Sequence, residues 1–187
     1  VATGAAAARI RQDAPSAIIA AVRAAGGEGV LYEASGQREF AFALLRAIGA
    51  RHRGREGRLI ASATPAVGSR LEEGDLEPSV VRAEQSNTSI IYGNRFILKL
   101  FRRLEPGVNP DLEIGRYLTS RRFPHVAPVA GSIEVRSGRG APATLAILQE
   151  FVPNAGDAWH YTLDALGHYF ERAAAIPAGE AADLMRP

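Results

Sequence analysis

Lys99 is the residue of this sequence whose type and setting most clearly suggest chemistry. The chain has 187 residues, of which 22 are lysine or arginine, and Lys99 is the one lysine, so 22 − 1 = 21 are arginines. Because side chains alternate along a strand, "RFILKLF" places Lys99 on one face with Ile97 and Phe101. An ammonium on such an apolar surface is costly unless it meets an opposite charge. The position of Lys99 therefore predicts a charged partner.

Glu113 is the candidate partner, because it lies on a helix that we expect one loop after this strand. A lysine offers a compact charge on a flexible stem, which suits contact with a phosphate. In protein kinases, a strand lysine holds the ATP phosphates and pairs with a glutamate of the next helix. A second interpretation stays open: Lys99 reaches solvent at a sheet edge, and Glu113 is an exposed helix residue.

The segment "EQSNTS" (residues 84–89) would cover the phosphates in a kinase arrangement, because it precedes the lysine strand by one strand and a turn. It has no glycine-rich motif. Hydroxyl and amide groups would supply the hydrogen-bond donors instead, from Ser86, Asn87, Thr88 and Ser89.

The elements that position these residues have a mixed pattern. "SVVRAEQSNTSIIY" and "RFILKLF" are predicted strands joined by a two-residue turn at Gly93 and Asn94. Asn109 is a predicted cap for the helix "PDLEIGRYLTS", with Pro110 at its first position and Asp111 favouring the helix dipole. "HVAPVAGSIEVR" and "ATLAILQEFV" follow as a strand pair. We therefore predict an α+β fold in which one helix packs on an antiparallel sheet.

A further helix is expected after Asp157, which is a candidate cap. Its apolar positions form one stripe: Trp159, Leu163, Leu166 and Phe170. We expect Trp159 to belong to a core.

The first part of the chain predicts a smaller unit. Its first residues are rich in alanine and are expected to be frayed, without the apolar core of a signal peptide. "SAIIAAVRA" and "GVLYEA" predict a hairpin. Ser35 is a candidate cap for a helix whose apolar stripe contains Phe40, Leu44 and Ile48. "RLIASATPAV" is a predicted strand, and the polar residues 68–78 are an expected linker.

The composition excludes several classes of protein. The sequence has no cysteine, which rules out disulfides and thiolate metal sites, and its four histidines form no metal-ligand motif. No apolar run is long enough to span a membrane. The basic run "RHRGREGR" lacks interleaved aromatic residues, so a solvated loop is a better interpretation than a nucleic-acid surface. A cytoplasmic location is the default expectation.

Three long stretches of the sequence resemble one known family. "AEQSNTSIIYGNRFILKLFRRLEPGVNPDLEIGRYLT", "FPHVAPVAGSIE" and "LAILQEFVPNAGDAWHYTLDAL" resemble the N-terminal half of bacterial maltokinases, which also occur fused to trehalose synthase. The likeness covers roughly residues 80–172. It implies a small N-terminal cap domain at 1–79 with a disordered or non-native start, a protein-kinase-like N-lobe at 80–153, and the hinge and first C-lobe helix at 154–187.

The resemblance also implies an activity and a set of binding residues. Maltokinases transfer the γ-phosphate of ATP to the anomeric hydroxyl of maltose, and the maltose 1-phosphate feeds α-glucan and trehalose metabolism. Carried over, Lys99 holds the ATP phosphates, Glu113 orients Lys99, and "QEFV" is the hinge between the lobes. The implied nucleotide-binding residues are Lys99, Glu113, Ser86, Asn87, Thr88, Gln149 beside the adenine, and Glu150 and Val152 through their backbone.

The sequence departs from the family pattern because no segment of the "HGD" or "DFG" type appears. The catalytic aspartate and the Mg²⁺ ligands of such kinases come from the second lobe. We therefore expect this chain to be a fragment with a missing C-lobe, inactive alone, whose complete enzyme uses ATP, Mg²⁺ and maltose. A trehalose synthase domain or subunit is an expected partner, and the exposed lobe interface would also allow a dimer. The alternative is a non-catalytic protein-interaction domain with the same lobe fold.

Overall fold

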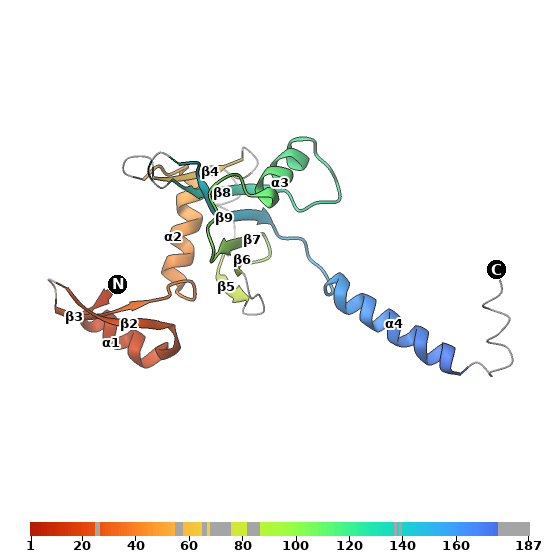
Figure 1. Cartoon of the computed structure of the whole chain (residues 1–187), viewed down its shortest axis with the longest axis horizontal. Coiled ribbons are helices and arrows are strands. Elements are labelled where there is room, and N and C mark those ends of the chain that lie inside the picture. The colour runs from red at the N-terminus through yellow and green to blue at the C-terminus, as the bar shows by residue number, and fades with distance from the viewer. Residues whose placement is uncertain are drawn as a thin grey trace. The chain divides into compact units, whose positions relative to one another are not determined.

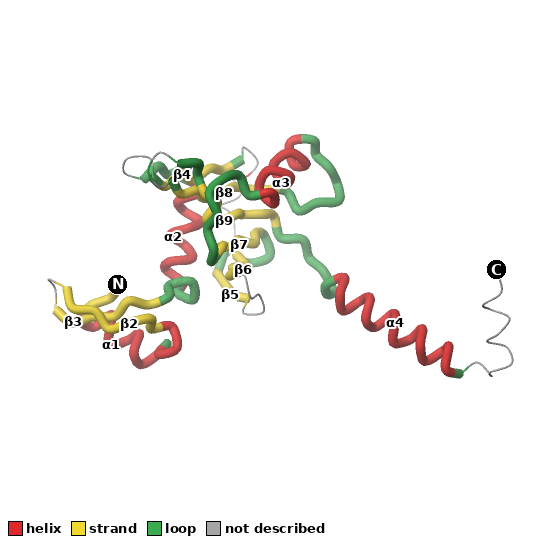
Figure 2. Tube along the Cα trace, viewed as in Figure 1, coloured by secondary structure: helices red, strands yellow, loops and turns green. Residues whose placement is uncertain are grey.

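The protein is described by a computed structural model that covers residues 1–24, 27–54, 58–64, 67, 76–81, 87–136, 138 and 140–175. Its contacts divide the chain into two units, residues 1–152 and residues 153–187. Helices and antiparallel strands both contribute to the first unit (Figures 1 and 2), so the predicted α+β class is confirmed.

The chain begins with a small antiparallel sheet of strand order β1-β3-β2. It comprises β1 (Ala2–Thr3), β2 (Ile18–Ala24) and β3 (Gly27–Tyr32), with α1 (Gly4–Asp13) and the short 3₁₀ turn η1 (Pro15–Ala17) between β1 and β2. The predicted hairpin is confirmed as β2 and β3. The expectation of a frayed start is wrong, because Ala7 and Ile10 of α1 are buried against Val30 and tie the start of the chain to this sheet.

The larger sheet has six antiparallel strands in the order β4-β8-β9-β7-β6-β5. The strands are β4 (Leu59–Ala63), β5 (Pro78–Val81), β6 (Asn87–Tyr92), β7 (Phe96–Phe101), β8 (Val129–Val135) and β9 (Ala143–Glu150). The segment that we predict as one strand before the lysine strand is therefore two strands, β5 and β6. Gly93 has a positive φ of 55°, as the turn requires, but the turn to β7 has three residues, 93–95, because Tyr92 pairs with Phe96.

Helix α2 (Arg38–Gly49) packs on one face of this sheet, which we call the α2 face. The predicted apolar stripe is confirmed: Leu44 and Ile48 are buried, and Phe40 packs against the same core. A Cβ on Gly131 of β8 would collide with Ile48, so this glycine permits the close approach of the helix. Ser35 is not the cap. Gln37 precedes the first turn, and the Ser35 hydroxyl donates to Glu33 instead.

Helix α3 (Pro110–Ser120) packs on the opposite face, the α3 face, where Leu112 is buried with Val129 and Ile147. The predicted cap is confirmed, because the Asn109 side chain accepts a hydrogen bond from the backbone N–H of Asp111 at 2.9 Å. A Cβ on Gly115 would lie 2.7 Å from Val129, so this helix also approaches the sheet closely.

The core of the α2 face crosses the boundary that we predict between residues 79 and 80. Ile48 and Ala61 from the first segment pack with Leu98 and Leu148 from the second. The assignment of cap and N-lobe domains stays a prediction, and the large core shows that these two segments stabilise each other.

The second unit contains α4 (Ala158–Ala174). Asp157 caps it as predicted, accepting from the backbone N–H of His160 at 2.8 Å, and this hydrogen bond lowers the pKa of Asp157. Trp159 is 69% exposed and the rest of the apolar stripe is exposed too, so the described residues of this unit form no core around α4. The expectation that Trp159 belongs to a core is not met within this unit. Within the described residues, no helix combines the length and the apolarity of a membrane span.

Candidate functional site

Lys99 lies on the α3 face, next to the first turn of α3. Its Nζ is 2.8 Å from Asp111 Oδ2, and it also lies 5.5 Å from the centre of the Phe101 ring. The Lys99 side chain is 32% exposed, so it is held by these contacts while remaining open to solvent. The sequence-based expectation that this lysine needs a charged partner is confirmed.

The partner itself differs from the one predicted. Asp111, and not Glu113, forms the ion pair with Lys99, and Glu113 is exposed. Each residue turns an α-helix by about 100°, so two residues separate these carboxylates by about 200° around the axis. Leu112 and Gly115 are the buried residues of α3, so they define the side of the helix that faces the sheet. With the helix in this orientation, Asp111 in the first turn reaches Lys99 of β7.

A cavity of about 440 Å³ opens beside Lys99. We call it the Lys99 cavity. Its lining includes Asn87, Lys99, Phe101, Asn109, Pro110 and Thr144. The cavity therefore combines the lysine with the N-terminal end of α3, where the helix dipole contributes further positive potential.

The residues expected to cover the phosphates are divided between the two faces of the sheet. Asn87 and Thr88 lie in β6, where alternation sends their side chains to opposite sides. Asn87 pairs with Phe101 and lines the Lys99 cavity. Thr88 pairs with Leu100, and its Oγ1 accepts from Arg102 at 3.2 Å on the α2 face. Ser89 is buried and pairs with Lys99 on the neighbouring strand. Ser86 lies outside the described residues.

Thr144 enters the Lys99 cavity because β9 contains a bulge. Ile133 pairs with Ala146 but Glu134 pairs with Thr144, so Leu145 is an extra residue on β9. Leu145 and Ala146 both pack with the core of the α2 face, although consecutive residues of a regular strand face opposite sides. Thr144, the residue before them, therefore faces the α3 side. Thr144 is 4% exposed, and its hydroxyl has no hydrogen-bond partner within the described part of the chain.

The predicted hinge lies at the end of β9. Gln149 is on the α3 face, opposite Ile97, and its side-chain amide donates to Ala127 at 3.4 Å. The backbone N–H of Glu150 donates to the Pro128 carbonyl at 2.9 Å, so this N–H is engaged within the sheet. Val152 is 54% exposed just beyond the strand. Their predicted roles in adenine binding stay predictions.

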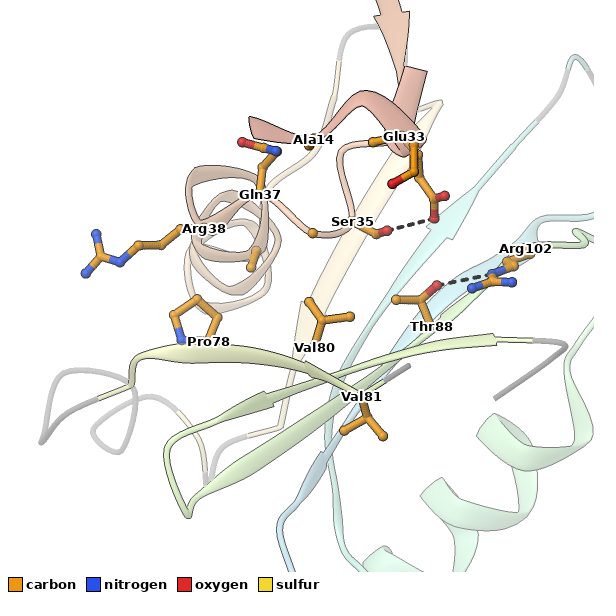
Figure 3. A pocket seen from close by; sticks show the side chains of 14 residues that line it. Ala14, Glu33, Ser35, Gln37, Arg38, Pro78, Val80, Val81, Thr88 and Arg102 are labelled. Atoms are coloured by element: carbon orange, nitrogen blue, oxygen red, sulfur yellow. Dashed lines mark hydrogen bonds between the residues drawn. The ribbon is translucent and has the colours of Figure 1, made fainter. Parts of the chain in front are cut away.

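A second cavity, of about 480 Å³, lies on the other side of the sheet near the N-terminus of α2. We call it the α2 cavity (Figure 3). Glu33 points toward Ser35 there, and Thr88 toward Arg102, whereas Arg38 extends away from them. Ser35 donates to Glu33 at 2.7 Å, and Arg102 donates to Thr88 at 3.2 Å. Arg38 binds both carboxylate oxygens of Glu77, which does not line the cavity, at 2.6 Å.

Arg116 of α3 is a polar residue that sequence reasoning did not select. Its guanidinium donates to Ser132 at 2.7 Å and to Ser62 at 3.1 Å, and lies 3.3 Å from Glu134. It therefore fixes α3 to β8 and β4, and with α3 the position of Asp111. Among the described residues, no group of three or more histidine, aspartate or glutamate side chains is arranged to bind a metal.

Comparison with known proteins identifies the fold. No family model matches the sequence. A glucosamine kinase in complex with glucosamine, ADP and inorganic phosphate matches 77% of this chain with a TM-score of 0.51 and 20% identity. A glucosamine kinase in crystal form A matches 77% of the chain with a TM-score of 0.50 and 20% identity. The chain therefore resembles part of these glucosamine kinases in fold. It spans 32% and 31% of the length of these two kinases.

Sequence reasoning missed two members of the site, Asp111 and Thr144. Asp111 had a visible signal, because an acidic residue in the first turn of the next helix can reach the lysine strand as well as favour the dipole. Thr144 had none, because the bulge that turns it into the Lys99 cavity depends on the pairing of β8 with β9.

Proposed function

We propose that this chain forms the nucleotide-binding small lobe of an ATP-dependent sugar kinase. The observation that carries the proposal is the setting of Lys99: the chain's one lysine lies in a cavity beside the N-terminus of the helix that packs on its sheet face. The sugar-kinase-like fold supports it, and a glucosamine kinase of that fold was solved with ADP.

In this proposal, Lys99 Nζ donates to phosphate oxygens of ATP and offsets part of their charge. Asp111 holds the ammonium in place before the nucleotide arrives, because their ion pair spans the gap between β7 and α3. Asn87 faces the same cavity and offers an amide donor. Mg²⁺ would neutralise the phosphates further, and we assign it no ligand in this chain.

Maltose is our proposed sugar acceptor. It is supported by the resemblance of residues 80–172 to maltokinases, and the acceptor contacts and the catalytic base would come from outside this chain. Phosphorylation of maltose and of glucosamine by a complete enzyme containing this chain would decide between these two acceptors. In that enzyme we expect Lys99→Met to reduce turnover by more than about a hundredfold, as expected for removal of a charge that stabilises the transferring phosphoryl group.

The chain's single lysine permits a direct test of nucleotide binding. An acyl phosphate of ATP transfers its acyl group to an amine: the lysine nitrogen forms an amide bond, the acyl–phosphate bond breaks, and ATP leaves as a proton is released. We expect Lys99 to be acylated at least tenfold faster by this reagent than by the same acyl group on inorganic phosphate. Excess ATP should suppress the reaction, and peptide mass mapping separates Lys99 from the α-amino group.

A pair of variants provides the control. Lys99→Met should weaken ATP binding to the chain at least tenfold, measured by calorimetry, and change the free energy of unfolding by less than about 1 kcal/mol because the stem stays apolar. Arg23→Met removes a cation of the small sheet that is 83% exposed and lies outside the lining of this cavity, and should change ATP binding less than threefold. Equal acylation by both reagents, with no protection by ATP, would exclude a nucleotide at Lys99.

A protein-interaction domain is the second candidate function. An exposed apolar stripe on α2 would favour it, but Leu44 and Ile48 are buried in the core of the α2 face. The exposed apolar residues of α4 remain available for contact with another domain or with a second copy of the chain. An interaction domain would not need to bind ATP at Lys99, so the acylation experiment also separates these two functions.

A further inference from the structure

The hydroxyl of Thr144 is a buried polar group that requires an explanation. Most buried hydroxyls have a hydrogen-bond partner, and an unpaired one costs free energy on folding. Thr144 has no partner within the described part of the chain, is 4% exposed, and lines the Lys99 cavity. A valine would fill the same space without this cost. The retained hydroxyl therefore suggests a partner that enters the cavity.

The cavity is suited to an anion. Lys99 supplies a positive charge, and Asn109 and Pro110 place the N-terminal end of α3 in the lining. Of the other charged groups, Arg103 and Glu105 lie 3.6 Å apart and offset each other. Asp111 offsets part of the charge of Lys99, but it does not line the cavity, so the lining itself presents the ammonium. A hydroxyl can donate to a phosphoryl oxygen, so Thr144 adds a neutral donor beside the cation.

The bulge in β9 gives Thr144 this position. If β9 were regular and Leu145 alternated like its neighbours, Thr144 would lie on the same side as Ala146, on the α2 face. Such bulges are common beside functional sites, where they change the direction of a side chain. The β9 bulge thus places Thr144, whose hydroxyl has no partner among the described residues, in the lining of the cavity that contains the chain's one lysine.

We propose that the Lys99 cavity binds a phosphoryl anion and that Thr144 is a further binding residue for it, donating its hydroxyl beside Lys99 Nζ. This inference rests on the proposed function in taking the anion to be part of a nucleotide. The anion site can nevertheless be tested separately, with an inorganic polyphosphate in place of ATP.

The test uses protection of Lys99 from a neutral amine-reactive acetyl ester. In the full chain we expect tripolyphosphate to slow the acetylation of Lys99. Peptide mass mapping measures this acetylation over time. Thr144→Val should raise the half-protecting concentration about tenfold, whereas Thr144→Ser, which keeps the hydroxyl, should stay within threefold of the original chain. Thr64→Val removes a hydroxyl at the end of β4 that bonds the Ala130 carbonyl, and should leave the protection unchanged.

A stability measurement distinguishes a binding role from a structural one. If the hydroxyl serves a ligand, Thr144→Val should raise the melting temperature of the ligand-free chain by about 2–4 °C, because a buried unpaired group is removed. A lower melting temperature, or protection equal to that of the original chain, would show that Thr144 serves the fold and would overturn the proposal. Absence of any protection by tripolyphosphate would overturn it as well.

Comparison with the ATP acylation experiment separates the two proposals. If ATP-directed acylation of Lys99 occurs and is unaffected by Thr144→Val, the role of Thr144 fails and the nucleotide site stands. If tripolyphosphate protection depends on Thr144 but ATP-directed acylation does not occur, the anion site stands and the nucleotide-binding function fails.

Discussion

The two faces of the six-stranded sheet have cavities of similar volume, about 480 Å³ on the α2 face and about 440 Å³ on the α3 face, but different polar chemistry. In the α2 cavity, two hydroxyl groups are each bonded to a charged group: Ser35 to Glu33, and Thr88 to Arg102. In the Lys99 cavity, the ammonium is paired with Asp111 beside a helix N-terminus, and the Thr144 hydroxyl has no partner among the described residues. Cavity volume therefore says little about function here, and the state of the polar groups says more.

The two faces also differ in the size of their hydrophobic cores. The core of the α2 face includes residues from α2 and from strands throughout the sheet, whereas the core of the α3 face has Leu112, Val129 and Ile147 at its centre. A large core on one face allows the other face to keep an open, partly polar cavity. We infer that the α2 face stabilises the unit and that the α3 face binds the ligand.

Ile48→Ala tests this division with the largest expected effect. Ile48 is fully buried between α2 and the sheet, so we expect the free energy of unfolding to fall by about 2–5 kcal/mol, measured by urea denaturation. The fraction of chain that remains folded should still be acylated at Lys99 by the ATP reagent at the original rate, because Ile48 lies on the other face.

The matched control is Ile114→Ala on α3. Ile114 is 57% exposed, so its removal should change the free energy of unfolding by less than about 0.5 kcal/mol. The division of the two faces would be wrong if Ile48→Ala cost less than about 1 kcal/mol, or if the folded fraction lost ATP-directed acylation.

The fold was predictable where a local pattern carried it. The apolar stripe of α2, the Asn109 cap with Pro110, and the need of Lys99 for a charged partner all follow from spacing along one element. What failed depended on pairing between distant segments. The burial of α1 requires contact with Val30 of β3, and the split of Asn87 from Thr88 depends on where β6 begins.

The candidate site was predictable to the same extent. Lys99 and its charged helix partner could be inferred from one strand and one loop, but the choice between Asp111 and Glu113 depends on which side of α3 faces the sheet. Thr144 could not be inferred at all, because a one-residue bulge relative to β8 determines its direction.

Tyr92→Phe is expected to have an intermediate effect on the free energy of unfolding. The pH dependence of this effect tests the stabilising role of the α2 face. Tyr92 is fully buried on the α2 face and donates its hydroxyl to the Ala41 carbonyl at 2.7 Å, so the substitution should cost about 1–2 kcal/mol at neutral pH. Burial also raises the pKa of Tyr92 above its ordinary value of 10.0. The folded chain therefore keeps this proton to higher pH than the unfolded chain does.

The sign follows from this difference. The stabilising contribution of the neutral phenol is fully present below pH 10 and falls as the pH rises further, because the unfolded chain loses the proton first. Urea denaturation between pH 8 and pH 11 should show a decline that is weaker in Tyr92→Phe. Tyr117→Phe is the control, because Tyr117 is 59% exposed. An equal decline in both variants would contradict the assignment to Tyr92.

Glu77→Gln should have the smallest effect, because the pair that it breaks is exposed. Arg38, at the start of α2, binds Glu77 just before β5 through two hydrogen bonds of 2.6 Å, and these bonds hold the pKa of Glu77 below its ordinary value of 4.5. Since the folded chain favours the carboxylate, the pair stabilises the fold above about pH 4.5 and is lost as the pH falls below it.

The melting temperature of Glu77→Gln should therefore be slightly lower than that of the original chain at pH 7, and the two should converge toward pH 3. Glu28→Gln breaks the exposed pair with Arg23 in the small sheet, at 2.9 Å, and provides a comparison for a single hydrogen bond away from α2. A deficit for Glu77→Gln that persists unchanged at pH 3 would show that the charge is not its cause. Loss of ATP-directed acylation in this variant would mean that the α2 face does contribute to the nucleotide site.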